Sequence, residues 1–230
     1  MASVISSSPR ALGVIARAAS CTLAVNGAGA GNLARAAAAA GAQLVQVSTD
    51  YVFDGTAQRP YVESDPTGPL SAYGRTKLAG EVAVLAASGE HAVVRTAWLF
   101  GGGGRNFVAS MLARAAAGRE EVAVVTDEVG CPTFTGHLAP RLVELAERRA
   151  AGLFHLAAAG ACSRNDFAQA IFAAAAVEVR VTPTTQSAYV RPARRPRWSV
   201  LGSERDVEPL PSWEQGLAAY LAPPTVVLGR

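Results

Sequence analysis

The sequence predicts a doubly wound α/β fold with a small C-terminal lobe. From about Leu23 to Ala176, short apolar runs bounded by turn residues alternate with longer helical patterns, which is the rhythm of β-α units around a parallel sheet. After Val181 the chain becomes rich in Pro, Thr and Arg, which we interpret as loops of the small lobe, and a short amphipathic segment follows at 213–221. With 230 residues, half of them hydrophobic, the chain is long enough to bury a sizeable core.

Hydrophobic periodicity predicts the individual elements in order. Candidate strands, where apolar residues form short bounded runs, lie at 43–48, 91–96, 121–125 and 152–156. Candidate helices lie between and after them, at 32–40, 73–87, 107–117, 138–149 and 165–176. The alanine tracts in the first and last of these helices favour helix interiors, because Ala is the best helix former.

A glycine-rich segment near the N-terminus, LAVNGAGAGNLARAAAAAG, is superficially similar to a dinucleotide-binding turn. Gly27, Gly29 and Gly31 stand between an apolar trio and a helical pattern, and Asp50 follows about twenty residues later. The apolar run 23–25 is too short for a buried central strand, so we reject this interpretation. We expect a helix here, weakened by roughly 0.5 to 1 kcal/mol for each extra glycine relative to alanine.

Charge and hydropathy exclude two classes of partner. The net charge is +3, but 18 acidic residues are mixed among 21 basic ones, so no broad positive field indicates nucleic acid binding. No apolar stretch approaches the roughly 20 residues that span a bilayer, so no membrane partner is expected. A small anionic ligand suits this balance of charge better.

Metal-ligand patterns are also missing from the sequence. Cys21, Cys131 and Cys162 lie far apart and form no CxxC pair, which argues against a zinc site or a disulfide framework and favours a reducing, cytoplasmic location. The histidines are scattered, and we interpret them as structural residues: His91, His137 and His155. No residue is therefore assigned as a metal ligand.

Tyr73 and Lys77 form a Tyr-x-x-x-Lys pattern at the start of a predicted helix. Their spacing places both side chains on one face of the helix. Lys77 is the only lysine in the sequence. A nearby ammonium favours the phenolate of a tyrosine whose pKa is normally about 10, and so brings its proton transfer within range. A surface helix pair without catalytic meaning gives the same spacing.

Hydroxyl residues at the end of the first predicted strand strengthen the catalytic hypothesis. Ser48 and Thr49 stand there, and ligands of open α/β sheets gather beyond the carboxyl ends of the strands. Thr49 with Tyr73 and Lys77 would suit proton donation to a carbonyl oxygen while hydride arrives from a nicotinamide. By itself, Thr49 is better explained as a strand-end cap.

Several long blocks of the sequence carry a family resemblance. They are STDYVFDG at 48–55, PYVESDPTGPLSAYGRTKLAGE at 60–81, VVRTAWLFGGGGRNFV at 93–108, DEVGCPT at 127–133, GLFHLAAAG at 152–160 and RRPRWSVL at 194–201. These blocks resemble the extended short-chain dehydrogenases/reductases, and within that group most closely the RmlD-like dTDP-4-dehydrorhamnose reductase family. The resemblance runs from about Leu23 to Leu221.

The resemblance implies a reaction and roles for four residues. NADPH, or alternatively NADH, would reduce dTDP-4-dehydro-L-rhamnose to dTDP-L-rhamnose at C4 of this 4-keto-6-deoxyhexose. Tyr73 would donate the proton, Lys77 would orient the nicotinamide ribose, and Thr49 would hold the keto oxygen. Ser48 would contact the cofactor together with Tyr73 and Lys77.

Five further residues would bind the sugar nucleotide by the same resemblance. Tyr51 and Trp98 match aromatic positions that line the family's substrate pocket, with core packing as the alternative. Asn106 follows the glycine loop where a polar side chain meets the nucleotide sugar. Arg194 and Arg197 would hold the diphosphate, because a guanidinium can bind phosphate oxygens in pairs. A solvated loop is an equal alternative for either arginine.

The chain departs from the family pattern at its N-terminal end. The resemblance implies a Rossmann-like domain over 23–160 and a substrate-binding lobe with its tail over 161–230. The atypical segment 1–22 contains no strand followed by a GxxGxxG turn for a cofactor pyrophosphate. We therefore expect an N-terminally incomplete Rossmann-like sheet, whose exposed edges favour a homodimer. A non-catalytic sugar-nucleotide-binding relative that has lost the cofactor is the alternative function.

Overall fold

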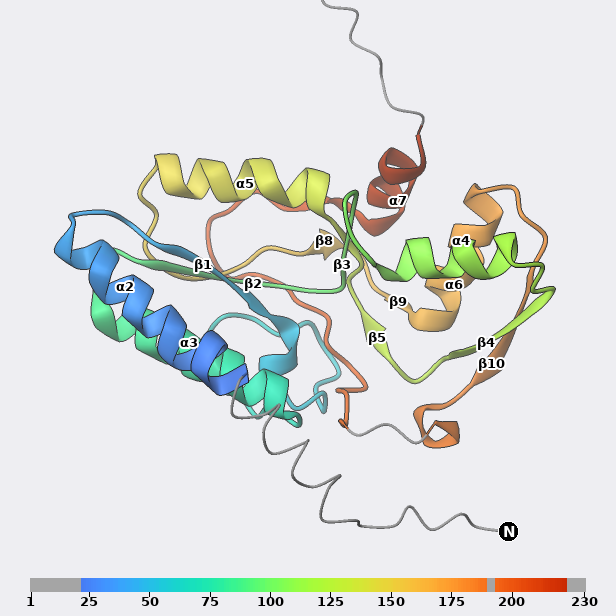
Figure 1. Ribbon diagram of the computed structural model, residues 1–230, viewed down its shortest axis with the longest axis horizontal. Helices are drawn as coiled ribbons and strands as arrows, with labels where there is room; N and C mark the ends of the chain where they lie inside the picture. The colour runs from blue at the N-terminus through green and yellow to red at the C-terminus, as the bar shows by residue number, and fades with distance from the viewer. Residues whose placement is uncertain (1–21, 190–192, 223–230) are drawn as a thin grey trace, which may run out of the picture.

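A parallel sheet with helices on both faces forms one half of the molecule (Figure 1). The computed structural model describes residues 22–189 and 193–222. The three-stranded sheet has the order β1-β2-β7, and its strands are β1 (Val45–Thr49), β2 (Ala92–Thr96) and β7 (Gly152–His155). Both pairings are parallel, and all three strands were expected from the sequence. The predicted α/β class is confirmed.

Alternate side chains of β2 face the two helical layers. Val93 packs in the cluster formed with α2 (Ala30–Ala39) and α3 (Ala72–Ala87). Val94, pointing the other way, packs in the cluster under α5 (Thr135–Glu147). Every residue of β2 is buried, as expected for a central strand of a parallel sheet that is covered on both faces.

The glycine-rich segment near the N-terminus is helical. A π-helical turn, η1 (Ala24–Gly29), continues directly into α2. The helix lies close to α3, because a Cβ added at Gly31 would be only 2.9 Å from the Cβ of Ala83. The prediction of a helix in place of a dinucleotide-binding turn is confirmed.

A second lobe beside the sheet has its own core (Figure 1). Its elements are the strands β4 (Glu121–Val125) and β10 (Arg180–Thr184) and the helices α4 (Phe107–Ala116), α6 (Arg164–Ala174) and α7 (Trp213–Leu221). The core includes Phe100, Phe167 and Trp213, whose side chains are buried together. This lobe takes β4 and α4 from before residue 160, so chain order and spatial order are interleaved. The predicted domain boundary at 160 stays a prediction.

The interpretation of the region after Val181 as loops is wrong for β10. This strand pairs in parallel with β4 from Arg180↔Glu121 to Thr184↔Val125. It contains Pro183, which cannot donate a backbone hydrogen bond and is confined to edge strands, first strand positions and bulges. β10 pairs with β4 alone among the described strands, so an edge position explains why its composition did not predict a strand.

Short elements join the two halves. They are β3 (Leu99–Phe100), β5 (Val129–Gly130), β6 (Thr133–Phe134), β8 (Ala158–Ala159), β9 (Cys162–Ser163), β11 (Leu210–Ser212) and the helical turns η2 (Asp50–Val52) and η3 (Gln186–Ala188). The antiparallel pairing of β5 with β9 sets the start of α6 beside the end of β4. Within the two described stretches, no helix is long and apolar enough to cross a membrane.

Candidate active site

Thr49, Tyr51 and Tyr73 meet at the carboxyl end of β1. The Thr49 hydroxyl caps the turn η2, accepting from the Tyr51 backbone N–H at 3.2 Å. Helix α3 begins beside this turn and closely approaches it, because a Cβ added at Gly74 would lie 2.2 Å from the Tyr51 carbonyl oxygen. The rings of Tyr51 and Tyr73 consequently meet edge to face, with their centroids 6.1 Å apart.

Tyr73 is partly exposed and lies beside the Thr49 hydroxyl. Tyr73 is 46% exposed, so a ligand can reach its side chain. Partial burial raises the pKa of Tyr73, whereas the neighbouring Thr49 hydroxyl lowers it. The structure thus brings the side chains of Thr49 and Tyr73 together, and their catalytic roles stay a prediction.

Lys77 lies one helical turn beyond Tyr73, against the same strand. Its Nζ donates a hydrogen bond to the Val47 carbonyl oxygen at 2.7 Å. Burial lowers the pKa of Lys77, and the charge of Glu81 opposes that shift. The ammonium is thus fixed at the end of β1, with only one of its donors used by described residues.

The Ser48 side chain links β1 to helix α3. Its hydroxyl donates to Glu81 Oε1 at 2.5 Å, and Glu81 also forms a 2.7 Å ion pair with Arg95. All three side chains are buried. Sequence reasoning placed Ser48 against the cofactor, whereas the structure directs its hydroxyl toward α3, where it ties β1 to the helix.

Asp50 is a buried acid that the sequence analysis did not assign to the site. Burial raises the pKa of Asp50 to about 6, while hydrogen bonds from Ser199 and Thr49 and the charge of Arg164 oppose that shift. Its Oδ2 has no hydrogen-bond partner among the described residues. Its place in the block STDYVFDG, directly after Thr49, was a usable signal. Asp50 can accept or donate a proton near neutral pH.

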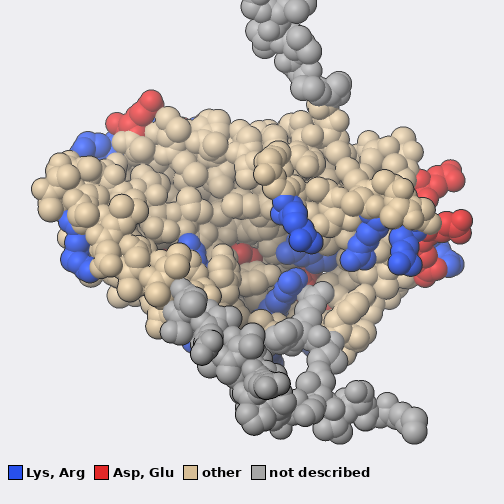
Figure 2. All heavy atoms as spheres, viewed as in Figure 1, with Lys and Arg blue, Asp and Glu red and all other residues tan. Residues whose placement is uncertain are grey.

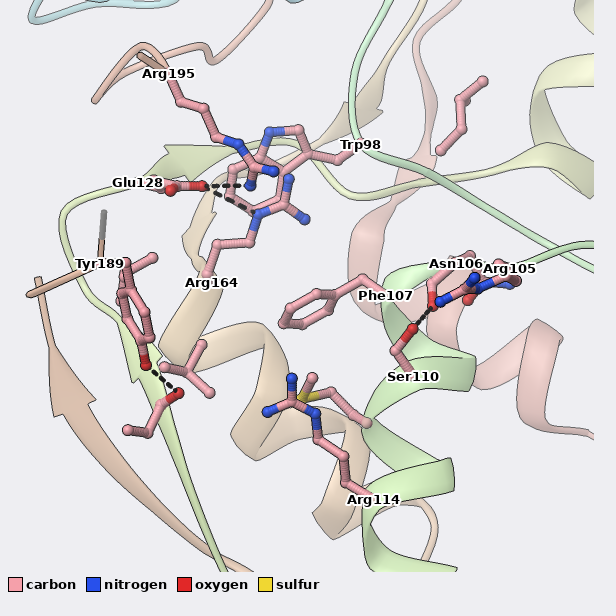
Figure 3. Close-up of a pocket in the computed structure, with 15 residues that line it drawn as sticks. Trp98, Arg105, Asn106, Phe107, Ser110, Arg114, Glu128, Arg164, Tyr189 and Arg195 are labelled. Atoms are coloured by element: carbon pink, nitrogen blue, oxygen red, sulfur yellow. Dashed lines mark hydrogen bonds and ion pairs between the residues drawn. The ribbon is translucent and has the colours of Figure 1, made fainter. Parts of the chain in front are cut away.

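A cavity of about 470 Å³ opens between α4, β4 and the start of α6 (Figure 3). Basic, aromatic and polar side chains line it, among them Arg105, Arg114, Arg164, Arg195, Trp98, Phe107, Tyr189, Asn106, Ser110 and Glu128. Figure 2 shows basic side chains gathered near the centre of this face. Its volume suits a small organic ligand, and the arginines favour an anionic one.

The predicted residues Trp98 and Asn106 both line this cavity. Asn106 caps α4, accepting from the Ala109 N–H at 2.9 Å and donating to the Gly101 carbonyl oxygen at 2.9 Å. Trp98 has a φ of 46°, a left-handed conformation that is a genuine outlier for so bulky a residue. One face of its ring is covered by Arg164, whose Cζ lies 3.4 Å from a Trp98 ring centroid.

The predicted residues Arg194 and Arg197 lie elsewhere. They line a neighbouring cavity of about 590 Å³ with Asp54 and Gln186, whereas Arg195 between them lines both cavities. Arg195 Nη1 and Arg164 Nε lie 3.5 and 3.7 Å from Glu128 Oε2. Sequence reasoning missed Arg164 and Arg195 as cavity residues, and no local spacing distinguishes them from the other arginines.

The described residues form no candidate metal centre, and the two described cysteines are buried. Within 22–189 and 193–222, no three His, Cys, Asp or Glu side chains are grouped to hold a metal ion. Cys131 and Cys162 are free and buried, and Cys21 lies outside the described residues.

Two curated proteins similar to this chain are named dTDP-4-dehydrorhamnose reductase. The chain is 48% identical to a dTDP-4-dehydrorhamnose reductase of Mycolicibacterium smegmatis over 86% of this chain and 63% of that protein. It is 47% identical to one of Streptomyces griseus, over 85% of this chain and 67% of that protein. The chain thus spans just under two thirds of the length of the first of these relatives.

Solved structures with this fold carry related names. A dTDP-4-dehydrorhamnose reductase of Clostridium acetobutylicum superposes with a TM-score of 0.84 at 41% identity, covering 89% of this chain and 74% of that one. One from Bacillus anthracis, in complex with NADP, gives 0.82 at 36% identity, covering 85% and 70%. The sequence pattern of the RmlD substrate binding domain matches residues 17–225. By sequence and by fold, the chain belongs to the RmlD substrate binding domain family.

Proposed function

We propose that this chain reduces dTDP-4-dehydro-L-rhamnose to dTDP-L-rhamnose with NADPH, in the biosynthesis of dTDP-rhamnose. The convergence of Thr49, Tyr73 and Lys77 at the end of β1, beside an arginine-lined cavity, is the observation that carries the proposal. The names of the similar proteins point to the same substrate.

The arrangement of Tyr73 and Lys77 fits a nicotinamide nucleotide. Both stand at the carboxyl end of a parallel strand, where such sheets bind nucleotides. Lys77 donates to the Val47 carbonyl alone among described residues, which leaves donors for ribose hydroxyls. NADPH, when bound, supplies the hydride, and NADH is the alternative donor. The NADP complex of the Bacillus anthracis relative favours NADPH.

The proton step belongs to the chain's own side chains. Thr49 holds the keto oxygen by a hydrogen bond, and Tyr73 gives that oxygen its proton as negative charge develops on it. The Lys77 ammonium, close by on the same helix face, stabilises the phenolate that remains. Each group therefore acts where charge appears during reduction of the ketone.

The sugar nucleotide binds along the cavity. We assign the sugar to the part of the cavity lined by Trp98 and the nucleotide to the part lined by Asn106. Tyr51, whose ring contacts Tyr73, would meet the sugar from the side of the catalytic residues. We assign the diphosphate to the arginines, with Arg195 shared between the two cavities and with Arg194 and Arg197 as outer contacts.

Two proposals concern the surroundings of the protein. Free Cys131 and Cys162 suit a reducing cytoplasm. β1 pairs only with β2 among the described strands, and this open edge supports a homodimer. Sedimentation equilibrium of the full chain distinguishes a dimer from a monomer.

Tyr73→Phe tests the proposal directly. We expect turnover of the 4-keto sugar nucleotide to fall by at least about 100-fold, because the variant keeps the ring and loses the proton. Binding of dTDP, measured by calorimetry, should stay within about twofold of the unmodified chain. Undiminished turnover would remove Tyr73 from the mechanism. Binding of dTDP without any binding of NADPH would indicate a non-catalytic sugar-nucleotide-binding protein instead.

A further inference from the structure

Arg164 is the least exposed cation of the cavity. Its side chain is 13% exposed, against 40% for Arg195. Arg105 and Arg114, on the α4 side, are exposed to solvent. A buried cation must be compensated by charge or by hydrogen bonds, so what compensates Arg164 is informative about the ligand.

The guanidinium of Arg164 is held in place without using its hydrogen-bond donors. Arg164 opens α6 after the capping residue Ser163, and its backbone N–H donates to the Glu128 carbonyl oxygen at 3.0 Å. The Cζ atom lies 3.4 Å from a Trp98 ring centroid and 5.2 Å from that of Phe107. Stacking on aromatic rings fixes the plane of the guanidinium and leaves its edge free.

That edge has no acceptor in the described part of the chain. Arg164 Nε is buried without a hydrogen-bond partner, and the nearest carboxylate oxygen, Glu128 Oε2, is 3.7 Å away. This separation allows attraction but is too long for a hydrogen bond. A fixed, desolvated guanidinium with unused donors matches the planar pair of oxygens that a phosphate offers.

The position of Arg164 identifies which phosphate it meets. Arg164 stacks on Trp98, which follows two residues after Thr96, and Thr96 is the register partner of Thr49 in the sheet, so Arg164 lies toward the reacting end of the site. Arg105 and Asn106 lie on another side of the cavity, on the α4 side (Figure 3). In a nucleoside diphosphate sugar, the phosphate bonded to the sugar lies nearest the reacting end.

We propose that Arg164, supported by the Trp98 ring, binds the sugar-linked phosphate and makes the site select nucleoside diphosphates over monophosphates. This inference rests on the proposed function only for the class of ligand. Trp98 then acts as the platform for the arginine, and its strained backbone keeps the ring under the guanidinium.

Calorimetric titration of the full chain with dTDP and with dTMP tests the inference without cofactor or turnover. Arg164→Gln should weaken dTDP binding about tenfold to a hundredfold, because charge-assisted hydrogen bonds are lost. Binding of dTMP should change by less than about twofold. Arg164→Lys, which keeps the charge but loses the planar fork, should lose several-fold in dTDP affinity. Arg119→Gln removes an exposed arginine outside the cavity and should leave both affinities unchanged.

The outcomes separate this inference from the proposed function. An unchanged ratio of dTDP to dTMP affinity in Arg164→Gln, or an equal loss for both ligands, overturns the role of Arg164 alone. If Arg164→Gln fails to fold, the ratio in Arg164→Lys decides in the same way. An unmodified chain that binds neither nucleotide overturns both proposals. Absence of ketone reduction by a chain that binds dTDP overturns only the reductase.

Discussion

The buried ion pair between Glu81 and Arg95 holds helix α3 against β2, the neighbour of β1 in the sheet. Their side chains are 3% and 4% exposed and 2.7 Å apart, and Ser48, next to Thr49, donates to the same carboxylate. Glu81→Gln keeps the size and removes the charge, so Arg95 remains buried without compensation. The expected loss in the free energy of unfolding is about 3 to 5 kcal/mol. For a chain of this size that lowers the melting temperature by about 6 to 20 °C.

Urea unfolding followed by tryptophan fluorescence and circular dichroism measures this loss. Glu90→Gln is the matched control, because it breaks a 3.2 Å ion pair with Arg149 whose side chains are 70% and 57% exposed. The control should lose less than about 1 kcal/mol. The double variant Glu81→Gln with Arg95→Met should recover part of the lost stability, because it also removes the uncompensated buried charge of Arg95. If Glu81→Gln costs no more than Glu90→Gln, the reasoning is refuted.

Two further predictions concern the end of β1. The pKa of the Asp50 carboxyl is about 6 in the folded chain, against 3.8 for an unperturbed aspartate. The folded state therefore binds the carboxyl proton more tightly than the unfolded state does. The contribution of Asp50 to stability therefore falls by about 3 kcal/mol as pH rises from about 4 to about 6, and Asp50→Asn should flatten that slope in unfolding titrations. An identical slope in the variant would contradict this. Gly74→Ala puts a Cβ 2.2 Å from the Tyr51 carbonyl oxygen, so it should displace the start of α3, cost about 1 to 3 kcal/mol and reduce turnover. Gly89→Ala, with open space around its Cβ, is the control, and equal effects of the two changes would argue against the close contact.

Local patterns were sufficient for most of the elements. The central strands are short segments rich in apolar residues, and the helices are periodic or rich in alanine, so both can be predicted from neighbouring residues. The sequence could also single out Thr49, Tyr73 and Lys77 as candidate residues, because a strand end and a four-residue helical spacing are local features. β10 was missed because Pro183 and its polar neighbours are tolerated only through pairing with a distant strand.

Only the tertiary structure decided where individual side chains point and which residues they contact. The sequence by itself determined that Ser48 stands beside Thr49. The fold decided that the Ser48 hydroxyl donates a hydrogen bond to Glu81 on α3. Sequence similarity indicated an arginine-rich ligand site and favoured Arg194 and Arg197, whereas packing brings Arg164 onto Trp98 and Arg195 beside Glu128. The physical reason is range: hydrophobic periodicity acts between near neighbours, whereas ion pairs and stacking join residues that meet only after the sheet has closed.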